Sequence, residues 1–225
     1  MNTCRLRDHQ KVILAGCFSG VEEDQAWEVT TRGAQPVPIL SCGAEEADTR
    51  VWLHVLRSPG TRKLVCSPDT DVYHIGLPLV HNQPIDVLVC VSMFSSQEHR
   101  YLSLNKLITS LEGDPDLSSI PRELLPKVLQ ILFICTGCDY VSYFAGFGKS
   151  TFLKIFFQHA SFINSVSQGT LASTCDTSRE LGFFSFVRLI DTVYFKKHLS
   201  LFTYDSPRGL FNSFPDSDPI SQHKQ

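Results

Sequence analysis

The sequence predicts an α/β fold in which a mostly parallel sheet is flanked by helices, and three observations support this prediction. Residues 85–93, IDVLVCVSM, are a largely apolar run with β-branched side chains, which is typical of a strand buried on both faces of a parallel sheet. The shorter run LVCS at 64–67 predicts a second buried strand. Segments with helical spacing of apolar residues lie between and around these runs, so strands and helices alternate along the chain.

The other elements follow in chain order. Residues 11–20 are a short apolar segment that we expect to be helical and to end at its glycines. Residues 44–57, AEEADTRVWLHVLR, predict a helix with an acidic first turn, because carboxylates suit the positive end of the helix dipole. Pro59 and Gly60 end it. Helices are also expected at 101–111, 121–135, from about Lys149, and 178–198, with a turn at 113–116.

Composition indicates a globular protein. The chain has 225 residues, of which 43% are hydrophobic and 19% charged, enough for one large core. We expect one domain over 1–203 and a disordered tail over 204–225, which is rich in Pro, Ser and Asp. The net charge of −3 gives no overall basic field, so a nucleic-acid partner would have to be held by a local patch.

The sequence also bears on the cellular compartment. The polar N-terminus lacks the pattern of a secretory signal, and the longest apolar stretch, 128–135, is far shorter than the roughly 18 residues of a bilayer span. Eight cysteines are spread through the chain, several within apolar runs, which suits buried thiols in a reducing compartment. We therefore expect an intracellular protein with no membrane partner, in the nucleus rather than the cytoplasm.

Acidic residues form three separated clusters at the boundaries of predicted elements. One opens the helix at 44–57, one follows the strand at 64–67, and one follows the helix at 121–135; the residues are Glu45, Glu46 and Asp48, then Asp69 and Asp71, then Asp139. The carboxyl ends of parallel strands form the crevice where α/β proteins bind ligands. These acids are therefore the candidate site.

Asp69 and Asp71 are two residues apart, so on an extended backbone both side chains point the same way. Crowded carboxylates need a cation to offset their repulsion, and hard oxygen ligands select Mg²⁺ or Mn²⁺. Glu46 and Asp48 have the same spacing but would diverge within a regular helix. Alternatives remain open for each cluster alone: helix-end charge at EEAD, a solvated turn at SPDTDV, and a turn residue at Asp139.

Three motifs resemble the flap endonuclease family, structure-specific 5′ nucleases of the PIN-like superfamily, over about residues 40–160. Glu46-Ala47-Asp48 is similar to the family's Glu-Ala-Glu, with Asp in place of the second Glu. Asp69-Thr70-Asp71 resembles its Asp-x-Asp, and Gly137-Cys138-Asp139-Tyr140 its Gly-Cys-Asp-Tyr. Gly146-Phe147-Gly148 resembles the turn of its helix-two-turn-helix motif, here expected over 136–160. Divergent, transposon-associated members look closer still.

The resemblance implies phosphodiester hydrolysis by two Mg²⁺ or Mn²⁺ ions, with DNA rather than RNA as the expected partner. It implies five catalytic metal ligands: Glu46, Asp48, Asp69, Asp71 and Asp139. It implies that Gly146 and Gly148 present backbone N–H groups to a phosphate, that the 146–148 turn holds K⁺, and that Lys149 and Lys154 add positive charge. A solvated helix face is the alternative for the two lysines.

One departure from the family pattern puts activity in doubt. The family's first catalytic aspartate follows an N-terminal strand, and another acid follows it before the Glu-Ala-Glu helix. Residues 1–45 offer no such strand and motif, so the chain looks truncated at its start. The alternative function is an inactive nuclease-fold module that binds nucleic acid or protein without cutting.

Two other interpretations have less support. DTDV after a strand suggests a haloacid-dehalogenase-type phosphatase, but Tyr73 stands where that family has Thr or Val. Cys135 and Cys138 form a CxxC that could be redox-active or half of a zinc site, yet no second pair accompanies it, which favours buried structural thiols. The eight histidines form no pattern that assigns them a role.

Overall fold

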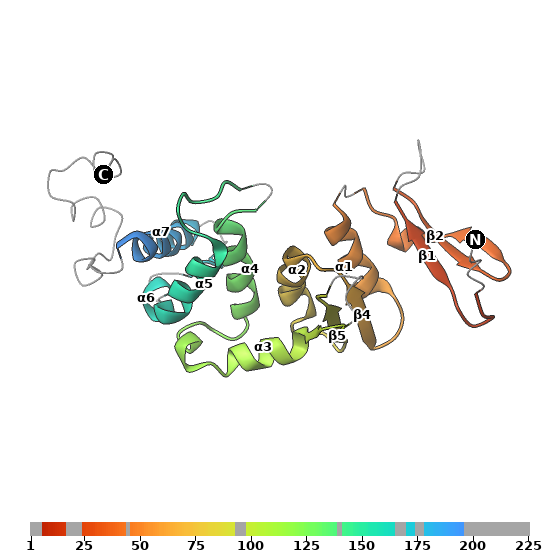
Figure 1. The fold of residues 1–225 in the computed structure, drawn as a ribbon, viewed down its shortest axis with the longest axis horizontal. Helices are drawn as coiled ribbons and strands as arrows, with labels where there is room; N and C mark the ends of the chain where they lie inside the picture. Colours follow the sequence, from red (N-terminus) through yellow and green to blue (C-terminus); the bar gives the residue numbers. More distant parts are fainter. Residues whose placement is uncertain are drawn as a thin grey trace. The chain divides into compact units, whose positions relative to one another are not determined.

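A computed structural model describes residues 6–16, 24–43, 46–92, 98–138, 141–164, 170–173 and 178–195. They belong to two compact units that divide between Asn105 and Lys106 (Figure 1). None of the helices in these ranges is long and apolar enough to cross a bilayer. The predicted tail at 204–225 lies outside the described residues.

The first unit opens with a small antiparallel sheet, drawn in red and orange in Figure 1. Its strands are β1 (Val12–Ala15), β2 (Ala26–Thr30) and β3 (Gly33–Pro36), and a short 3₁₀ helix, η2 (Pro38–Leu40), follows. The prediction of a helix over 11–20 is therefore wrong for residues 11–16, and residues 17–20 lie outside the described residues. Exposure alternates along β1, as it does in a strand with one covered face, and Leu14 pairs with Trp27 of β2.

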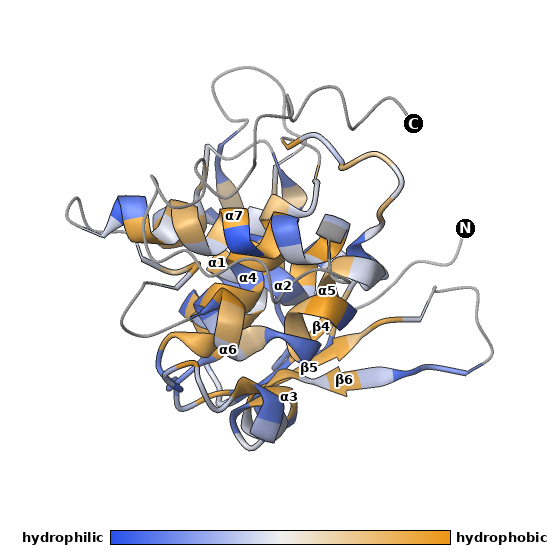
Figure 2. Cartoon of the chain, turned by 90° about the vertical axis from the view of Figure 1, so that its left-hand side faces the viewer, coloured by the Kyte–Doolittle hydropathy of each residue, from blue (hydrophilic) through white to orange (hydrophobic). Residues whose placement is uncertain are grey.

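A second sheet in the same unit contains β4 (Arg62–Cys66), β5 (Asp86–Cys90) and β6 (Tyr101–Ser103), in that order. β4 and β5 are parallel, as the sequence predicted, and hydrophobic residues predominate in β5 (Figure 2). β6 is antiparallel to β5, so this sheet is mixed. The α/β class is confirmed, whereas a mostly parallel sheet is not what the described strands form.

Two helices of the first unit, α1 (Ala47–Arg57) and α2 (Thr70–Val80), pack side by side (Figure 1). The predicted helix at 44–57 is confirmed as α1. Trp52 of α1 is 2% exposed, and its Nε1 donates a hydrogen bond to the Val72 carbonyl of α2 at 2.7 Å. The absence of a side chain at Gly76 leaves room for the Trp52 ring, because a Cβ there would lie 2.0 Å from Cζ2. Tight packing at this glycine therefore joins the two helices.

The second unit is helical where it is described. α3 (Leu104–Glu112) crosses the boundary between the units, and η3 (Pro115–Leu117), α4 (Leu125–Cys135), α5 (Lys149–Gln158), α6 (Ala160–Ile163) and α7 (Arg179–Phe195) follow. The helices expected at 121–135, after the glycine turn and at 178–198 are confirmed as α4, which begins only at Leu125, α5 and α7; residues 196–198 lie outside the described residues. The segment 101–111 begins with β6 and becomes helical only at Leu104. Leu132, Phe152, Phe156 and Leu189 are fully buried core residues.

Candidate functional site

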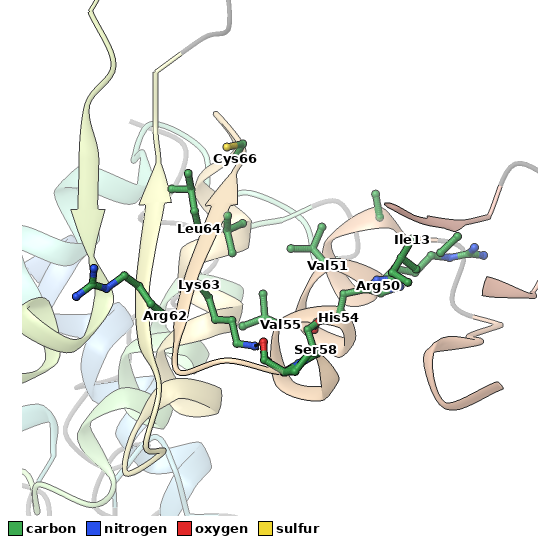
Figure 3. A pocket seen from close by; sticks show the side chains of 14 residues that line it. Ile13, Arg50, Val51, His54, Val55, Ser58, Arg62, Lys63, Leu64 and Cys66 are labelled. Carbon is green, nitrogen blue, oxygen red and sulfur yellow. Dashed lines mark hydrogen bonds between the residues drawn. The ribbon is translucent and has the colours of Figure 1, made fainter. Parts of the chain in front are cut away.

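Four of the five predicted ligands lie at one end of the first unit. α1 ends at Arg57 and β4 begins at Arg62, and the two elements run in opposite directions (Figure 3). The start of α1 is therefore at the same end as the carboxyl end of β4, and Ala47 and Cys66 line the same cavity. α2 begins there too, directly after β4. We call this end, with Glu46, Asp48, Asp69 and Asp71, the acidic edge.

The first acidic pair opens α1. Glu46 is the N-cap residue, with extended backbone angles of φ −76° and ψ 127°, and its side chain makes no capping hydrogen bond. Asp48 follows in the first turn, where its negative charge is favourable at the positive end of the helix. The predicted helix-end charge is present here, and it leaves the role of metal ligand untested. Glu45 lies outside the described residues.

The second acidic pair opens α2, a helix that the sequence analysis missed. Asp69 is the N-cap, and its Oδ1 accepts a hydrogen bond from the Asp71 backbone N–H at 3.0 Å. Asp71 lies in the first helical turn, so the two residues are not both on the extended backbone that the sequence analysis expected after the strand. A helix N-cap is a sufficient structural reason for an aspartate at position 69. Asp114 and Asp116 repeat the same arrangement at η3, with a hydrogen bond of 2.9 Å.

Tyr73 lies within the electrostatic field of the second pair. Burial raises the pKa of its hydroxyl, and the negative charges of Asp69 and Asp71 raise this pKa further. A phenol is protonated at neutral pH in any case, and the raised pKa keeps Tyr73 a hydrogen-bond donor at more alkaline pH as well. Sequence analysis assigned Tyr73 no role, although its position one turn into α2 would have suggested one if that helix had been recognised.

Asp139, the fifth predicted ligand, lies outside the described residues and belongs to the second unit by its number. Cys138 and Val141, on either side of Asp139 and Tyr140, exchange two backbone hydrogen bonds of 2.9 and 3.1 Å. Within the described ranges, no group of three or more His, Cys, Asp or Glu side chains is close enough together to hold a metal ion. Glu46, Asp48, Asp69 and Asp71 are all described, so the structure does not gather three of these four into a metal site, and the convergence of the five acids stays a prediction.

The glycine turn before α5 has one position that requires glycine. Gly146 has a φ of +82°, in the left-handed region that other residues rarely adopt. Gly148 is the N-cap of α5 with a φ of −88°, which any residue can adopt. A Cβ at either position would meet no described atom within 4 Å, so the backbone is open on this side. Phe144 and Phe147 anchor the turn on Phe152 and Tyr194.

The two lysines beyond the turn differ in their surroundings. The Lys149 Nζ lies 3.4 Å from the centre of the Phe133 ring in α4, a cation–π contact that links α5 to α4. Lys154 is exposed on α5. Lys149 therefore has a structural contact of its own, while Lys154 fits either the solvated helix face or the predicted contact with phosphate.

Cys135 and Cys138 are both free thiols and half-buried. Burial raises the pKa of the Cys135 thiol, and the neighbouring Cys138 raises it further. A raised pKa reduces the thiolate fraction, the opposite of what a reactive redox pair needs. This favours the interpretation of structural thiols.

One cluster at the end of β5 was not anticipated. The Ser92 Oγ lies 3.5 Å from the His99 Nδ1 and 3.5 Å from the Cys90 Sγ, and it accepts a hydrogen bond from the Arg100 N–H at 3.1 Å. Because β5 is parallel to β4, this cluster is at the same end of the sheet as the acidic edge. In the sequence, the only sign of this cluster was a serine, Ser92, at the carboxyl end of a predicted strand.

Comparison with known proteins identifies no relative. A scan against protein-family models, a search of the curated proteins and a search of the solved structures each find no significant match.

Proposed function

We propose that the acidic edge binds a divalent cation and supports hydrolysis of phosphodiester bonds in nucleic acid, DNA rather than RNA. The observation that supports this is topological: α1 and α2 both begin at the carboxyl end of β4 and bring four carboxylates to that end. The carboxyl ends of parallel strands are where α/β proteins bind ligands. The resemblance of three sequence motifs to the flap endonucleases suggests the type of reaction, which is phosphodiester hydrolysis.

The donor chemistry fits Mg²⁺ or Mn²⁺, since carboxylate oxygens are the ligands that these hard cations prefer. Asp69 uses Oδ1 in its helix cap, which leaves Oδ2 for a cation. Asp69 and Asp71 would hold the ion, with Glu46 or Asp48 bound through water, and the ion would supply an activated water and charge neutralisation. Asp139 as a further ligand, a second ion, and K⁺ at 146–148 are parts of the proposal that depend on the resemblance alone.

The chain's own side chains would then orient the substrate. Tyr73, whose phenol is protonated at neutral pH, can donate a hydrogen bond to a phosphate oxygen beside the cation. The open backbone of the Gly146–Gly148 turn and the exposed Lys154 would contact the nucleic-acid backbone.

A second candidate function is a module of the same fold that binds nucleic acid or protein without cutting. The N-cap hydrogen bond of Asp69 favours it, because this bond explains the aspartate without a metal. The repetition of the arrangement at Asp114 and Asp116, in a part of the chain with no predicted site, points the same way.

The experiment is cleavage of end-labelled 5′-flap DNA by the wild-type chain with Mg²⁺ or Mn²⁺. The test variant is Asp69→Asn with Asp71→Asn, because asparagine preserves an N-cap while removing the charge. The matched control is Asp114→Asn with Asp116→Asn. Nuclease activity predicts cleavage that only the first variant loses. Cleavage that survives in both variants refutes the metal assignment, and DNA binding without cleavage in the wild type supports the module.

A further inference from the structure

β4 is the outer strand of its sheet and has one unpaired edge among the described residues. The Thr61 carbonyl and the Ser67 N–H bond to β5, so the odd-numbered residues of β4 face that partner. By this alternation, Arg62, Leu64 and Cys66 direct their N–H and C=O groups to the other side. Leu64 is 57% exposed, unlike the buried Val65 beside it. An unpaired edge of this kind is a template for another strand.

A cavity of about 580 Å³ runs along this edge (Figure 3). All five residues of β4 line it on one side, and Val51 and Val55 of α1 line it on the other. Ile13 and Ala15 of β1 also contribute. The space next to the edge is therefore bordered by apolar side chains that a strand paired with β4 would cover.

The charged residues along this cavity are all basic. They are Arg50, Arg62 and Lys63, and none of the described residues that line it is acidic. His54 also lines it, but burial lowers the pKa of its imidazole, so it is neutral at neutral pH. Of the three basic residues, Arg62 is the most exposed, with 84% of its side chain accessible. Its Nε lies 3.9 Å from the Asp86 Oδ2.

Lys63 places a cation at one end of the cavity. The residue is only 8% exposed, and its Nζ donates to the carbonyls of Ser58 and Pro59 at 2.6 and 2.8 Å. Both acceptors are neutral, and an ammonium has three donors. A carboxylate at this end of the cavity would pair with a buried charge, whose attraction is screened less by water and salt than that of a charge on the open surface.

We propose that the free edge of β4 binds an extended segment of a partner protein in which apolar and acidic residues alternate. Backbone hydrogen bonds to Leu64 and Cys66 would extend the sheet by one strand. Side chains on one face of the added strand would contact the apolar wall of α1, and acidic side chains on its other face would meet Arg62. A second copy of β4 would instead bring its own Arg62 and Lys63 to a cavity whose charged residues are already basic, so the like charges would repel each other. This proposal does not depend on the nuclease function.

The probe is a capped nine-residue peptide of alternating valine and glutamate, and the control peptide alternates valine and lysine. Amide hydrogen exchange, followed by NMR on the full chain, distinguishes the even-numbered residues of β4, which face the free edge, from the odd-numbered residues, which face β5. Without peptide, we expect the amides of Leu64 and Cys66 to exchange fast and those of Lys63 and Val65 to exchange slowly. We expect the glutamate peptide to slow exchange at Leu64 and Cys66 while the lysine peptide does not.

Matched charge reversals test the electrostatic part. Arg62→Glu should weaken binding of the glutamate peptide by about threefold to tenfold, because it replaces a cation at the rim with an anion. Arg100→Glu makes the same change at an exposed arginine that does not line the cavity and should leave the affinity unchanged. Slow exchange of the Val65 amide in each variant confirms that the β4–β5 pairing is intact.

Three results would overturn the proposal. One is equal binding of both peptides, which would show that the basic residues do not select the partner, or binding of neither, in which case the basic residues only guard the edge against pairing. Another is binding of the glutamate peptide that leaves the Leu64 and Cys66 amides unprotected. The third is protection of these amides without peptide that grows with protein concentration, which would assign the edge to a second copy of the chain.

Discussion

Substitution of Gly76 by alanine tests the packing that brings the acidic edge together. The new Cβ would lie 2.0 Å from Cζ2 and 2.3 Å from Cη2 of Trp52. The Trp52 ring has little freedom to move, because it is 2% exposed and its Nε1 is bonded to the Val72 carbonyl. We therefore expect the substitution to separate α1 from α2.

Two opposing terms set the size of the effect. Overpacking of a filled core costs about 3 kcal/mol at the upper end of its usual range, while replacement of a helical glycine by alanine gains about 1 kcal/mol. The net loss in the free energy of unfolding is about 2 kcal/mol. Urea denaturation followed by circular dichroism and tryptophan fluorescence measures it.

A matched control and a second background complete the test. Gly113→Ala should change the free energy of unfolding by less than about 0.5 kcal/mol, because its Cβ would lie 3.6 Å from the nearest described atoms. In a Trp52→Phe background, which lacks the larger indole ring, the cost of Gly76→Ala should fall by about half or more. An equal cost in both backgrounds, or a neutral Gly76→Ala, would refute the proposed contact.

Three further predictions concern single residues. Asp69→Ala should lower the free energy of unfolding by about 1 kcal/mol and Asp69→Ser by much less, since serine keeps the helix cap; equal losses in urea denaturation would contradict the capping role. Gly146→Ala should cost about 1 kcal/mol because of its φ of +82°, and a neutral result would show that the turn adopts another conformation. Cys135 should react with iodoacetamide at higher pH than the exposed Cys66, because its raised pKa keeps the thiol protonated; the order is checked by mass spectrometry across pH and would be contradicted by its reversal.

The sequence predicted those elements whose signal is local. The run at 85–93 became β5, and the segment with an acidic first turn became α1, because continuous apolar residues and helix-end charges act within their own elements. The helix expected at 11–20 is instead β1. Its partner β2 begins only at Ala26, so the pairing of the two strands could not be recognised from the residues of β1 alone.

The main gap in the site prediction was α2. Asp69 is a favourable N-cap, and Val72, Leu77 and Val80 have helical spacing, but Pro78 within the segment argues against a helix. Packing of Gly76 against Trp52 outweighs this local preference. Once α2 is recognised, Asp69 and Asp71 belong to the start of a helix, and Tyr73 enters the candidate site. Asp139 lies outside the described residues, so its role stays a prediction.

Titration of the isotopically labelled chain with Mn²⁺, followed by NMR, tests the proposed cation site most directly, because the paramagnetic ion broadens only the signals of nearby nuclei. We expect saturable broadening that begins at the amides of Glu46, Asp48, Asp69 and Asp71 and disappears in the Asp69→Asn, Asp71→Asn variant. Broadening that begins elsewhere, or that is unchanged in this variant, would contradict a cation site at the end of the sheet where α1 and α2 begin.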